Sequence, residues 1–346
     1  MASEDKPSAY IEFPGKLPAK HEILYMLLNS KGEFLSGEAL GSRADISRPA
    51  VWKNIQALIE EGFPIQTARR KGYKIAQECD ILIPPEISCA LTTSRMGSRI
   101  FYTPRTGSTN NDAKSLADSA MDGTVFISEI QTMGKGRLGR QWESPKGGIF
   151  LSLILKPEIP PVKVPGLSLV VGYTVAKTVQ SQFGLKALVK WPNDVLVSNH
   201  KIAGILCEMR AELDRVSSVI VGIGINANVE TSHMPETVRE RSTSISEEIG
   251  RPVDRNLLIA TLLNTLEPCY GRFLESGLES FLPEIEKMLA YMGNPVMIHN
   301  AAFGPRQAQH GKLHGLDKEG RIILLTGDGT TRTFAAGDVS LRPKLR

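Results

Sequence analysis

The chain has 346 residues, of which 41% are hydrophobic and 23% are charged. This composition excludes a disordered chain, and the length allows two or three compact domains with buried cores. The formal net charge is only +4, so a surface for nucleic acid or phosphate must be a local cluster of cations. The sequence has no signal-peptide block and no membrane-spanning apolar run, and its four cysteines are scattered. We therefore expect a cytoplasmic protein with reduced cysteines and no membrane contact.

Residues 1–82 are predicted to form a winged helix-turn-helix domain. Apolar spacing predicts one helix over residues 22–28 and a second over residues 36–43, with Ser36 as its N-cap. A third helix is expected after Ser47, with a buried stripe at positions 51, 55, 58 and 59. Residues 65–75 then predict two short strands around a basic turn, and the prolines of residues 81–85 indicate a linker.

Cations are concentrated on the third helix and the hairpin of this domain. Residues 47–74 hold six basic and two acidic residues, whereas the first 80 residues hold 11 of each. This distribution favours DNA binding, because cations contact phosphates and arginine and asparagine can contact base edges. The predicted DNA-binding residues are Arg48, Lys53, Asn54, Arg69, Arg70 and Lys71. The alternative is a winged helix that serves only for packing or dimerisation.

The rest of the chain divides into two further blocks. Residues 83–290 alternate apolar strands, such as 124–128, 149–155 and 216–221, with helical stretches such as 167–183, which predicts a mixed α/β domain. Residues 291–346 contain alternating strands with a Gly-Asp-Gly turn at 327–329, which is typical of a small all-β barrel. The expected fold class is therefore multidomain α+β.

A loop at residues 131–142 alternates glycines with cations. Such a loop can surround an anion, because glycine permits close backbone approach while lysine and arginine donate to phosphate or carboxylate oxygens. Its glycines also fit a dinucleotide-binding fingerprint by letter, but a helix-breaking run follows where that motif requires a helix. A solvated basic hairpin remains the alternative.

Four more segments place polar residues where the apolar pattern does not require them. Residues 106–111 put small hydroxyls and a glycine before a helix, which suits either a polar ligand or a simple N-cap. Residues 190–194 end a strand with a carboxylate that could help to position magnesium, and Lys201 begins an apolar strand where an anion could neutralise it. Residues 222–228 end a strand with two glycines and two amides. Because phosphate-loop, nucleophile-elbow and zinc-helix motifs are missing, we expect catalysis by positioning and charge neutralisation.

In chain order, S-T-N (108–110), G-x-G-R-x-G-R-x-W (134–142), K-W-P-N-D (190–194), K-x-A-G-I-L (201–206) and G-x-G-I-N-x-N (222–228) resemble the motifs of biotin protein ligases. The N-terminal block resembles that of the bifunctional subgroup that also represses the biotin operon. Residues 337–342 resemble part of the family's C-terminal SH3-like barrel. The resemblance therefore covers nearly the whole chain.

This resemblance implies a two-step reaction with biotin and ATP as substrates and Mg²⁺ as the supporting ion. Biotin is activated to biotinyl-5′-AMP and then transferred to a lysine of a biotin carboxyl carrier protein. The adenylate would also permit homodimerisation on operator DNA. The alternatives are a regulator with weak ligase activity, a ligase whose winged helix does not bind DNA, and a lipoate or octanoate protein ligase.

The resemblance also implies roles for individual residues. Lys201 and Arg137 are the expected catalytic residues, Asp194 the expected metal contact, and Gly204 would leave room for the ligand. The expected biotin contacts are Ser108, Thr109, Asn110, Gln131, Gly134, Lys135, Gly136, Arg137, Lys201 and Gly204. The expected ATP or adenylate contacts are Arg137, Arg140, Trp142, Asn193, Asn226 and Arg342. Lys135 departs from the arginine common in the family and lacks its planar fork of donors.

Overall fold

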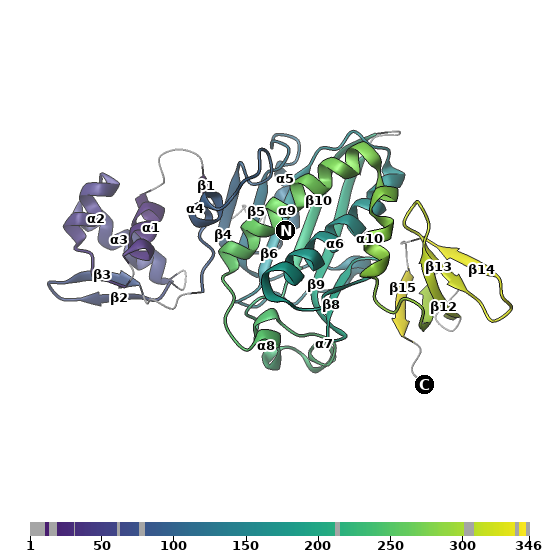
Figure 1. Cartoon of the computed structure of the whole chain (residues 1–346). Coiled ribbons are helices and arrows are strands. Elements are labelled where there is room, and N and C mark those ends of the chain that lie inside the picture. The colour runs from purple at the N-terminus through teal and green to yellow at the C-terminus, as the bar shows by residue number, and fades with distance from the viewer. Residues whose placement is uncertain are drawn as a thin grey trace, which may run out of the picture.

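The computed structural model describes residues 11–13, 19–30, 32–60, 63–75, 80–211, 215–300, 308–335 and 339–343. They form a row of three regions, with a helical unit at one end, a large sheet with helices in the middle, and a small β region at the other end (Figure 1). Within these residues, no helix is both long and apolar enough to cross a membrane.

The N-terminal unit has the predicted winged helix-turn-helix order. Ser36 caps the second helix by accepting a hydrogen bond from the Ala39 amide at 3.0 Å. Val51, Ile55 and Leu58 are fully buried, as their spacing predicts. The elements are α1 (Ala19–Asn29), α2 (Gly37–Ala44), α3 (Arg48–Glu60), β2 (Ile65–Ala68) and β3 (Gly72–Ile75).

Two features join this unit to the central region. Strand β1 (Ile11–Phe13) precedes the helical unit in the chain, yet it pairs antiparallel with β4 (Ile100–Thr106) and forms one edge of the central sheet. The expected linker at residues 81–85 is also more ordered than its prolines indicate. Residues 81–83 are buried, and Pro84 begins the short helix α4 (Pro84–Cys89), since proline fits the first turn of a helix.

The central sheet has eight strands in the order β1-β4-β5-β6-β10-β9-β8-β7. Strands β4 and β5 run parallel, and every other neighbouring pair of described strands is antiparallel. This arrangement confirms a mixed sheet. The strands are β4 (Ile100–Thr106), β5 (Val125–Gln131), β6 (Ile149–Leu155), β7 (Leu188–Lys190), β8 (Asp194–Val197), β9 (His200–Ala211) and β10 (Val216–Ile225).

Helices cover both faces of this sheet. The long helices α6 (Val164–Phe183) and α9 (Arg255–Ser276) lie along one face (Figure 1), and α5 (Thr109–Leu116) packs on the other. Because side chains alternate along a strand, Val125 and Ile127 join the large core while Phe126 joins the smaller core beneath α5. The short helices are α7 (Glu236–Arg239), α8 (Ile245–Ile249) and α10 (Leu282–Lys287).

The C-terminal region is a five-stranded antiparallel sheet in the order β14-β13-β12-β11-β15. A turn at residues 327–329 joins β13 to β14, as predicted. Within the described residues, β14 and β15 do not pair with each other, so closure into a barrel stays a prediction. The strands are β11 (Pro295–Asn300), β12 (Ala308–Leu316), β13 (Ile322–Leu325), β14 (Thr331–Phe334) and β15 (Val339–Pro343). Trp191 links this region to the central one by donating from Nε1 to the Gly320 carbonyl at 3.0 Å.

Candidate active site

A cavity of about 630 Å³ gathers the predicted ligand-binding residues of the central region. All of them except Gly134 line it, although they come from five separate segments of the sequence. Arg342 lies on β15 opposite Met297, which also lines the cavity. The Arg342 side chain is outside the described residues. The sequence motifs therefore converge at one place in the fold.

The loop at residues 131–142 is a compact hairpin. The Gly136 amide donates to the Arg140 carbonyl at 2.7 Å, and the Trp142 amide donates to the Gly134 carbonyl at 2.9 Å. A single 3₁₀ turn lies at its tip, where Leu138 has a φ of 59° and Gly139 a φ of 69°. No α-helix follows the loop, which agrees with rejection of the dinucleotide-binding motif. Gly134 does not line the cavity but shapes the hairpin, because a Cβ there would lie 2.3 Å from the Trp142 carbonyl oxygen.

Two paired glycines form a seat for the Trp142 indole. Gly204 of β9 lies directly opposite Gly224 of β10. A Cβ on Gly204 would lie 2.9 Å from the indole, and a Cβ on Gly224 would lie 2.6 Å from it, so the ring fits only against glycine at both positions. The room that we expected Gly204 to leave for a ligand is thus occupied by Trp142. The indole Nε1 is buried with no hydrogen-bond partner in the described part of the chain, and the ring centroid lies 4.9 Å from the Lys201 Nζ.

Substitution of Gly224 by alanine is expected to displace Trp142 and to reduce kcat/KM for adenylate formation by roughly 100-fold, since a 1 Å shift of a positioning group can have that effect. Steady-state pyrophosphate release measures the change. Gly271→Ala in α9 is the matched control, because a Cβ there meets nothing within 4 Å. Equal activity of both variants would show that the glycine seat is not required.

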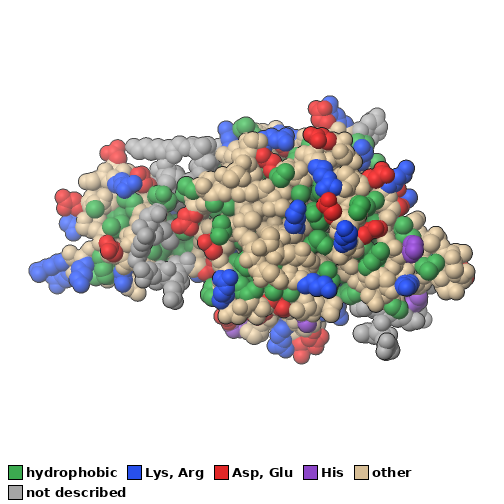
Figure 2. Space-filling model, viewed as in Figure 1, with side chains coloured by type: hydrophobic (Ala, Val, Ile, Leu, Met, Phe, Trp, Pro, Cys, Tyr) green, Lys and Arg blue, Asp and Glu red, His purple; other side chains and the backbone are tan. Residues whose placement is uncertain are grey.

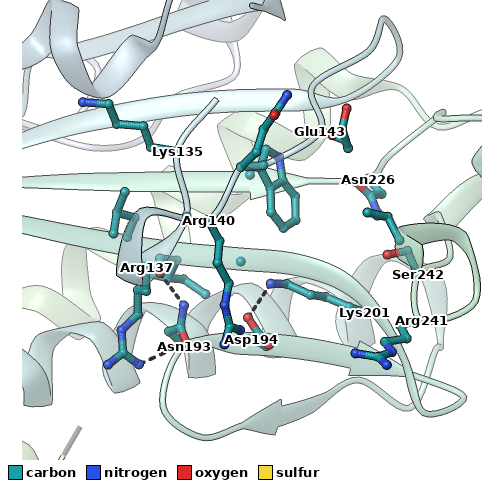
Figure 3. A pocket seen from close by; sticks show the side chains of 18 of the residues that line it. Lys135, Arg137, Arg140, Glu143, Asn193, Asp194, Lys201, Asn226, Arg241 and Ser242 are labelled. Carbon is teal, nitrogen blue, oxygen red and sulfur yellow. Dashed lines mark hydrogen bonds and ion pairs between the residues drawn. The ribbon is translucent and has the colours of Figure 1, made fainter. Parts of the chain in front are cut away.

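Cationic side chains gather at the Asn193–Asp194 end of the cavity. Lys201 Nζ lies 2.6 Å from Asp194 Oδ1, and Lys190 Nζ lies 3.7 Å from Asp194 Oδ2. The Arg137 guanidinium donates to Asn193 Oδ1 at 3.3 Å. Figure 3 shows Arg140 extending from the hairpin toward the same end. This local excess of positive charge suits phosphate or carboxylate oxygens.

Several lining residues were not among the predicted contacts. Lys190 is the first residue of the K-W-P-N-D motif, but the sequence did not predict a contact for its side chain. Arg241 and Ser242 come from the segment between α7 and α8, which carries no motif. Backbone contacts bring this segment to the site, because the Lys201 amide donates to the Arg241 carbonyl at 2.8 Å and Thr243 donates back to Lys201 at 3.1 Å. The sequence around Arg241 and Ser242 does not indicate a site, because the backbone bonds that bring this segment to Lys201 form only in the folded protein.

A hydrogen-bonded wall faces the cavity at the start of α5. Ser108 is at the N-cap position but makes no side-chain capping bond, which disfavours the simple N-cap alternative. The Gln131 side chain accepts from Thr109 Oγ1 at 3.1 Å and donates to Ser144 Oγ at 2.9 Å. Asn110 donates to Glu208 at 2.8 Å. These bonds hold the amides of Gln131 and Asn110 in fixed orientations.

Lys135 points away from the cation cluster (Figure 3). Its Nζ donates to Asn111 Oδ1 at 2.7 Å, so the lysine connects the hairpin to α5. Lysine can make this single contact, whereas the longer fork of arginine is shaped for bidentate contacts. The departure from the family pattern at Lys135 therefore has a structural use in this chain.

The residues around Asp194 do not form a prepared magnesium site. Each of its carboxylate oxygens faces a lysine ammonium group. In the described part of the chain, no group of three or more His, Cys, Asp or Glu side chains could hold a metal ion. Mg²⁺ commonly binds substrate phosphates and keeps several waters. The geometry thus favours Mg²⁺ that arrives with ATP over an ion held by Asp194.

The Asp194→Asn variant is expected to lower kcat by up to about 100-fold, because Lys201 loses the carboxylate that positions it. The Mg²⁺ concentration needed for half-maximal activity should stay unchanged. Titration of the initial rate with Mg²⁺ measures both quantities, and Glu240→Gln, which changes another acid of the cavity lining, is the control. A large rise in the Mg²⁺ requirement would instead support Asp194 as the metal contact that the sequence predicts.

The predicted DNA-binding cations lie on the surface of the N-terminal unit. Arg48 and Lys53 on α3 and Arg69, Arg70 and Lys71 at the β2–β3 turn are exposed. Figure 2 shows basic side chains gathered at the tip of this hairpin, at the far end of the molecule. Asn54 is half-buried and donates to the Ala50 carbonyl at 2.9 Å, so part of its amide is used within the helix.

Comparison with known families identifies all three regions. Residues 20–74 match the HTH domain, residues 102–226 match the biotin/lipoate A/B protein ligase family, and residues 304–342 match the biotin protein ligase C terminal domain. These matches and the cavity define a protein ligase that carries a helix-turn-helix domain.

Whole-chain relatives identify the family more closely. The chain is 35% identical to the bifunctional ligase/repressor BirA of Bacillus spizizenii, over 93% of this chain and 98% of that protein. It is 33% identical to the bifunctional ligase/repressor BirA of Escherichia coli, over 93% and 96% respectively. The solved biotin protein ligase from Aquifex aeolicus in complex with biotin and ATP aligns with a TM-score of 0.62 and 29% identity, over 71% of this chain and 99% of that one. The chain belongs to the family of bifunctional biotin protein ligases and repressors.

Proposed function

We infer that the protein is a biotin protein ligase that also represses transcription. It activates biotin with ATP to biotinyl-5′-AMP and transfers biotin to a lysine of a biotin carboxyl carrier protein. The observation that carries this conclusion is the convergence of Lys201, Arg137 and Arg140 on one end of a cavity whose motifs belong to a biotin ligase family.

In the first step, an oxygen of the biotin carboxylate attacks the α-phosphorus of ATP, and the bond to pyrophosphate breaks. Two anions must approach each other, so the chain's contribution is to neutralise and orient them. We assign this role to Lys201, which Asp194 holds at the cavity wall, with Arg137 and Arg140 on the phosphates. In the second step, the carrier lysine amine attacks the biotinyl carbonyl, loses a proton and releases AMP.

The remaining cavity residues are assigned by position. Ser108, Thr109 and Gln131 would contact biotin, while Asn110 supports that wall through Glu208. Trp142, Asn193 and Asn226 would contact the nucleotide. The hairpin at residues 131–142 would retain the adenylate, and Arg342 would reach the phosphates from β15.

Substrate selectivity separates a biotin ligase from a lipoate or octanoate ligase. We expect ATP-dependent pyrophosphate release with biotin and only background release with lipoate or octanoate. Equal release with octanoate would contradict the proposed acid substrate, because the fixed amides of this wall suit a polar ring better than an aliphatic chain.

The repressor function is proposed to act through a homodimer on two DNA half-sites, as is typical of helix-turn-helix repressors. Exposed cations on α3 and at the β2–β3 turn support DNA contact. We also propose domain boundaries near residues 82 and 290, although β1 from the N-terminal block pairs with the sheet of the central domain. The C-terminal strands are proposed to close into an SH3-like barrel. The match of residues 304–342 to the family's C-terminal domain supports this closure.

A gel-shift assay with DNA from upstream of the protein's own coding region tests repression. The expected result is a shift that strengthens when biotin and ATP are both present. A shift that neither substrate changes would contradict a biotin-responsive repressor, and an unshifted DNA under every condition would favour a ligase whose helix-turn-helix unit has another use.

A further inference from the structure

One tryptophan of the winged helix is not used by the fold. The chain has three tryptophans. Trp191 is buried and Trp142 is half-buried in the cavity wall, whereas 58% of Trp52 on α3 is exposed. A large apolar side chain exposed to this extent indicates an interaction surface more often than a structural role.

The helical spacing explains why Trp52 faces outward. Val51, Ile55 and Leu58 point to the domain core, and residues 48, 52 and 56, at i, i+4 and i+8, form a stripe on the flank of that face, because residues 52 and 56 lie about 100° around the helix from Val51 and Ile55. Arg48 and Trp52 on this stripe are exposed and Gln56 is half-buried. Trp52 is thus part of an outward stripe that the domain does not need for stability.

The surrounding charges identify the occupant of this surface. Before Glu60 at its C-terminal end, every charged residue of α3 is basic. The neighbouring hairpin turn adds exposed Arg69, Arg70 and Lys71. These cations favour an anionic partner, and the exposed indole one helical turn from Arg48 suits an apolar contact within that partner. DNA offers both, since thymine presents a methyl group in the major groove among the phosphates.

We propose that Trp52 reads DNA sequence by packing its indole against a thymine methyl group in the major groove. It is the fifth residue of α3, in the N-terminal half that contacts base edges in helix-turn-helix proteins. The proposal rests on the repressor function inferred above and adds a specificity-determining residue to it. The cations at the β2–β3 turn then supply affinity for phosphate without sequence preference.

The experiment begins with selection of binding sequences from a randomised duplex pool by the full-length protein with biotin and ATP. Each thymine of the selected sequence is then replaced by deoxyuridine, and affinity is measured by fluorescence anisotropy. Loss of one contacted methyl group should weaken wild-type binding by about fourfold at one position in each half-site. The Trp52→Ala variant should bind less tightly and should no longer respond to deoxyuridine at that position.

Two controls separate this effect from misfolding. The Trp52→Ala variant should keep the wild-type rate of pyrophosphate release, because Trp52 lies outside the catalytic region. Leu257→Ala, which removes another half-exposed apolar side chain from the surface of α9, should keep the wild-type deoxyuridine response.

Two results would overturn the inference, and they differ in what else they contradict. If the pool yields a selected sequence and Trp52→Ala retains the same deoxyuridine response as wild type, Trp52 does not read a methyl group, but the repressor function stands. If wild type selects no sequence, the repressor function itself is wrong, and the role of Trp52 is wrong with it.

Discussion

Replacing Lys201 with alanine is expected to slow formation of biotinyl-adenylate by roughly 100- to 1,000-fold, which is the effect of removing one preorganised donor from a developing negative charge. Lys201 lies against Asp194 at 2.6 Å and beneath Trp142, so its ammonium group is held at the cavity wall before the substrates arrive. The loss should appear mainly in kcat, because the cation acts where carboxylate and phosphate oxygens approach each other. Single-turnover pyrophosphate release measures it.

Lys190→Ala is the matched control for this experiment. Lys190 also faces Asp194, but at 3.7 Å and on the other carboxylate oxygen, so its removal should have a much smaller effect. The fold should tolerate either change, because one lysine remains beside Asp194 in both variants. A Lys201→Ala protein with normal turnover, or a greater loss in Lys190→Ala, would contradict the assignment of Lys201.

Arg255→Met is expected to destabilise the central region by about 3–5 kcal/mol, the typical consequence of leaving buried charges without their partner. The Arg255 side chain is fully buried. It forms ion pairs with Asp80 and, at 2.9 Å, with Glu129, and it donates to the Gly148 carbonyl at 2.8 Å. Urea unfolding followed by the central region's signal measures the loss. Arg210→Met, which removes an exposed ion pair with Asp118, should change stability by only about 0–1 kcal/mol.

The loss in Arg255→Met should depend on pH with a definite sign. Burial raises the pKa of Glu129 in the folded protein, and Arg255 opposes that rise. Without Arg255, the folded-state pKa rises further above the unfolded value, so stability falls as pH increases through this interval. The variant should therefore be less destabilised at acid pH than at neutral pH. Adding Glu129→Gln should recover part of the stability, and a pH-independent loss would contradict this explanation.

The same cluster fixes the path from the winged helix to the catalytic region. The Leu82 amide donates to Glu129 at 2.5 Å, and the Ile83 amide donates to Asn256 at 2.7 Å. Asn228 donates to Asp80 at 2.9 Å, two residues after Asn226 of the cavity. The hydrogen-bonded network of the linker thus reaches Asn228, two residues along the chain from the cavity-lining Asn226.

Local patterns were sufficient to predict much of this structure. Ser36 as an N-cap and the stripe of Val51, Ile55 and Leu58 depend on neighbouring residues alone, so sequence spacing reveals them. The motif residues of the cavity were found because several strand ends and loops carry polar groups that the apolar pattern does not require.

Features that depend on distant pairing could not be predicted in this way. Strand β1 joins a sheet whose next strand begins at Ile100. Gly204 and Gly224 form a seat only after β9 and β10 pair, and an isolated glycine in a strand does not reveal its neighbour. Arg255 follows an N-cap aspartate at a helix start, and nothing nearby in the sequence indicates that Asp80 and Glu129 surround it.

The measurement that tests the central claim most directly is the mass of an intact carrier domain after incubation with the protein, biotin, ATP and Mg²⁺. Transfer to one lysine predicts a gain equal to one biotinyl group, which disappears when ATP is omitted or when the acceptor lysine is replaced by arginine. A carrier domain of unchanged mass, measured alongside normal release of pyrophosphate, would contradict the transfer step. An unchanged mass without pyrophosphate release would contradict the ligase function as a whole.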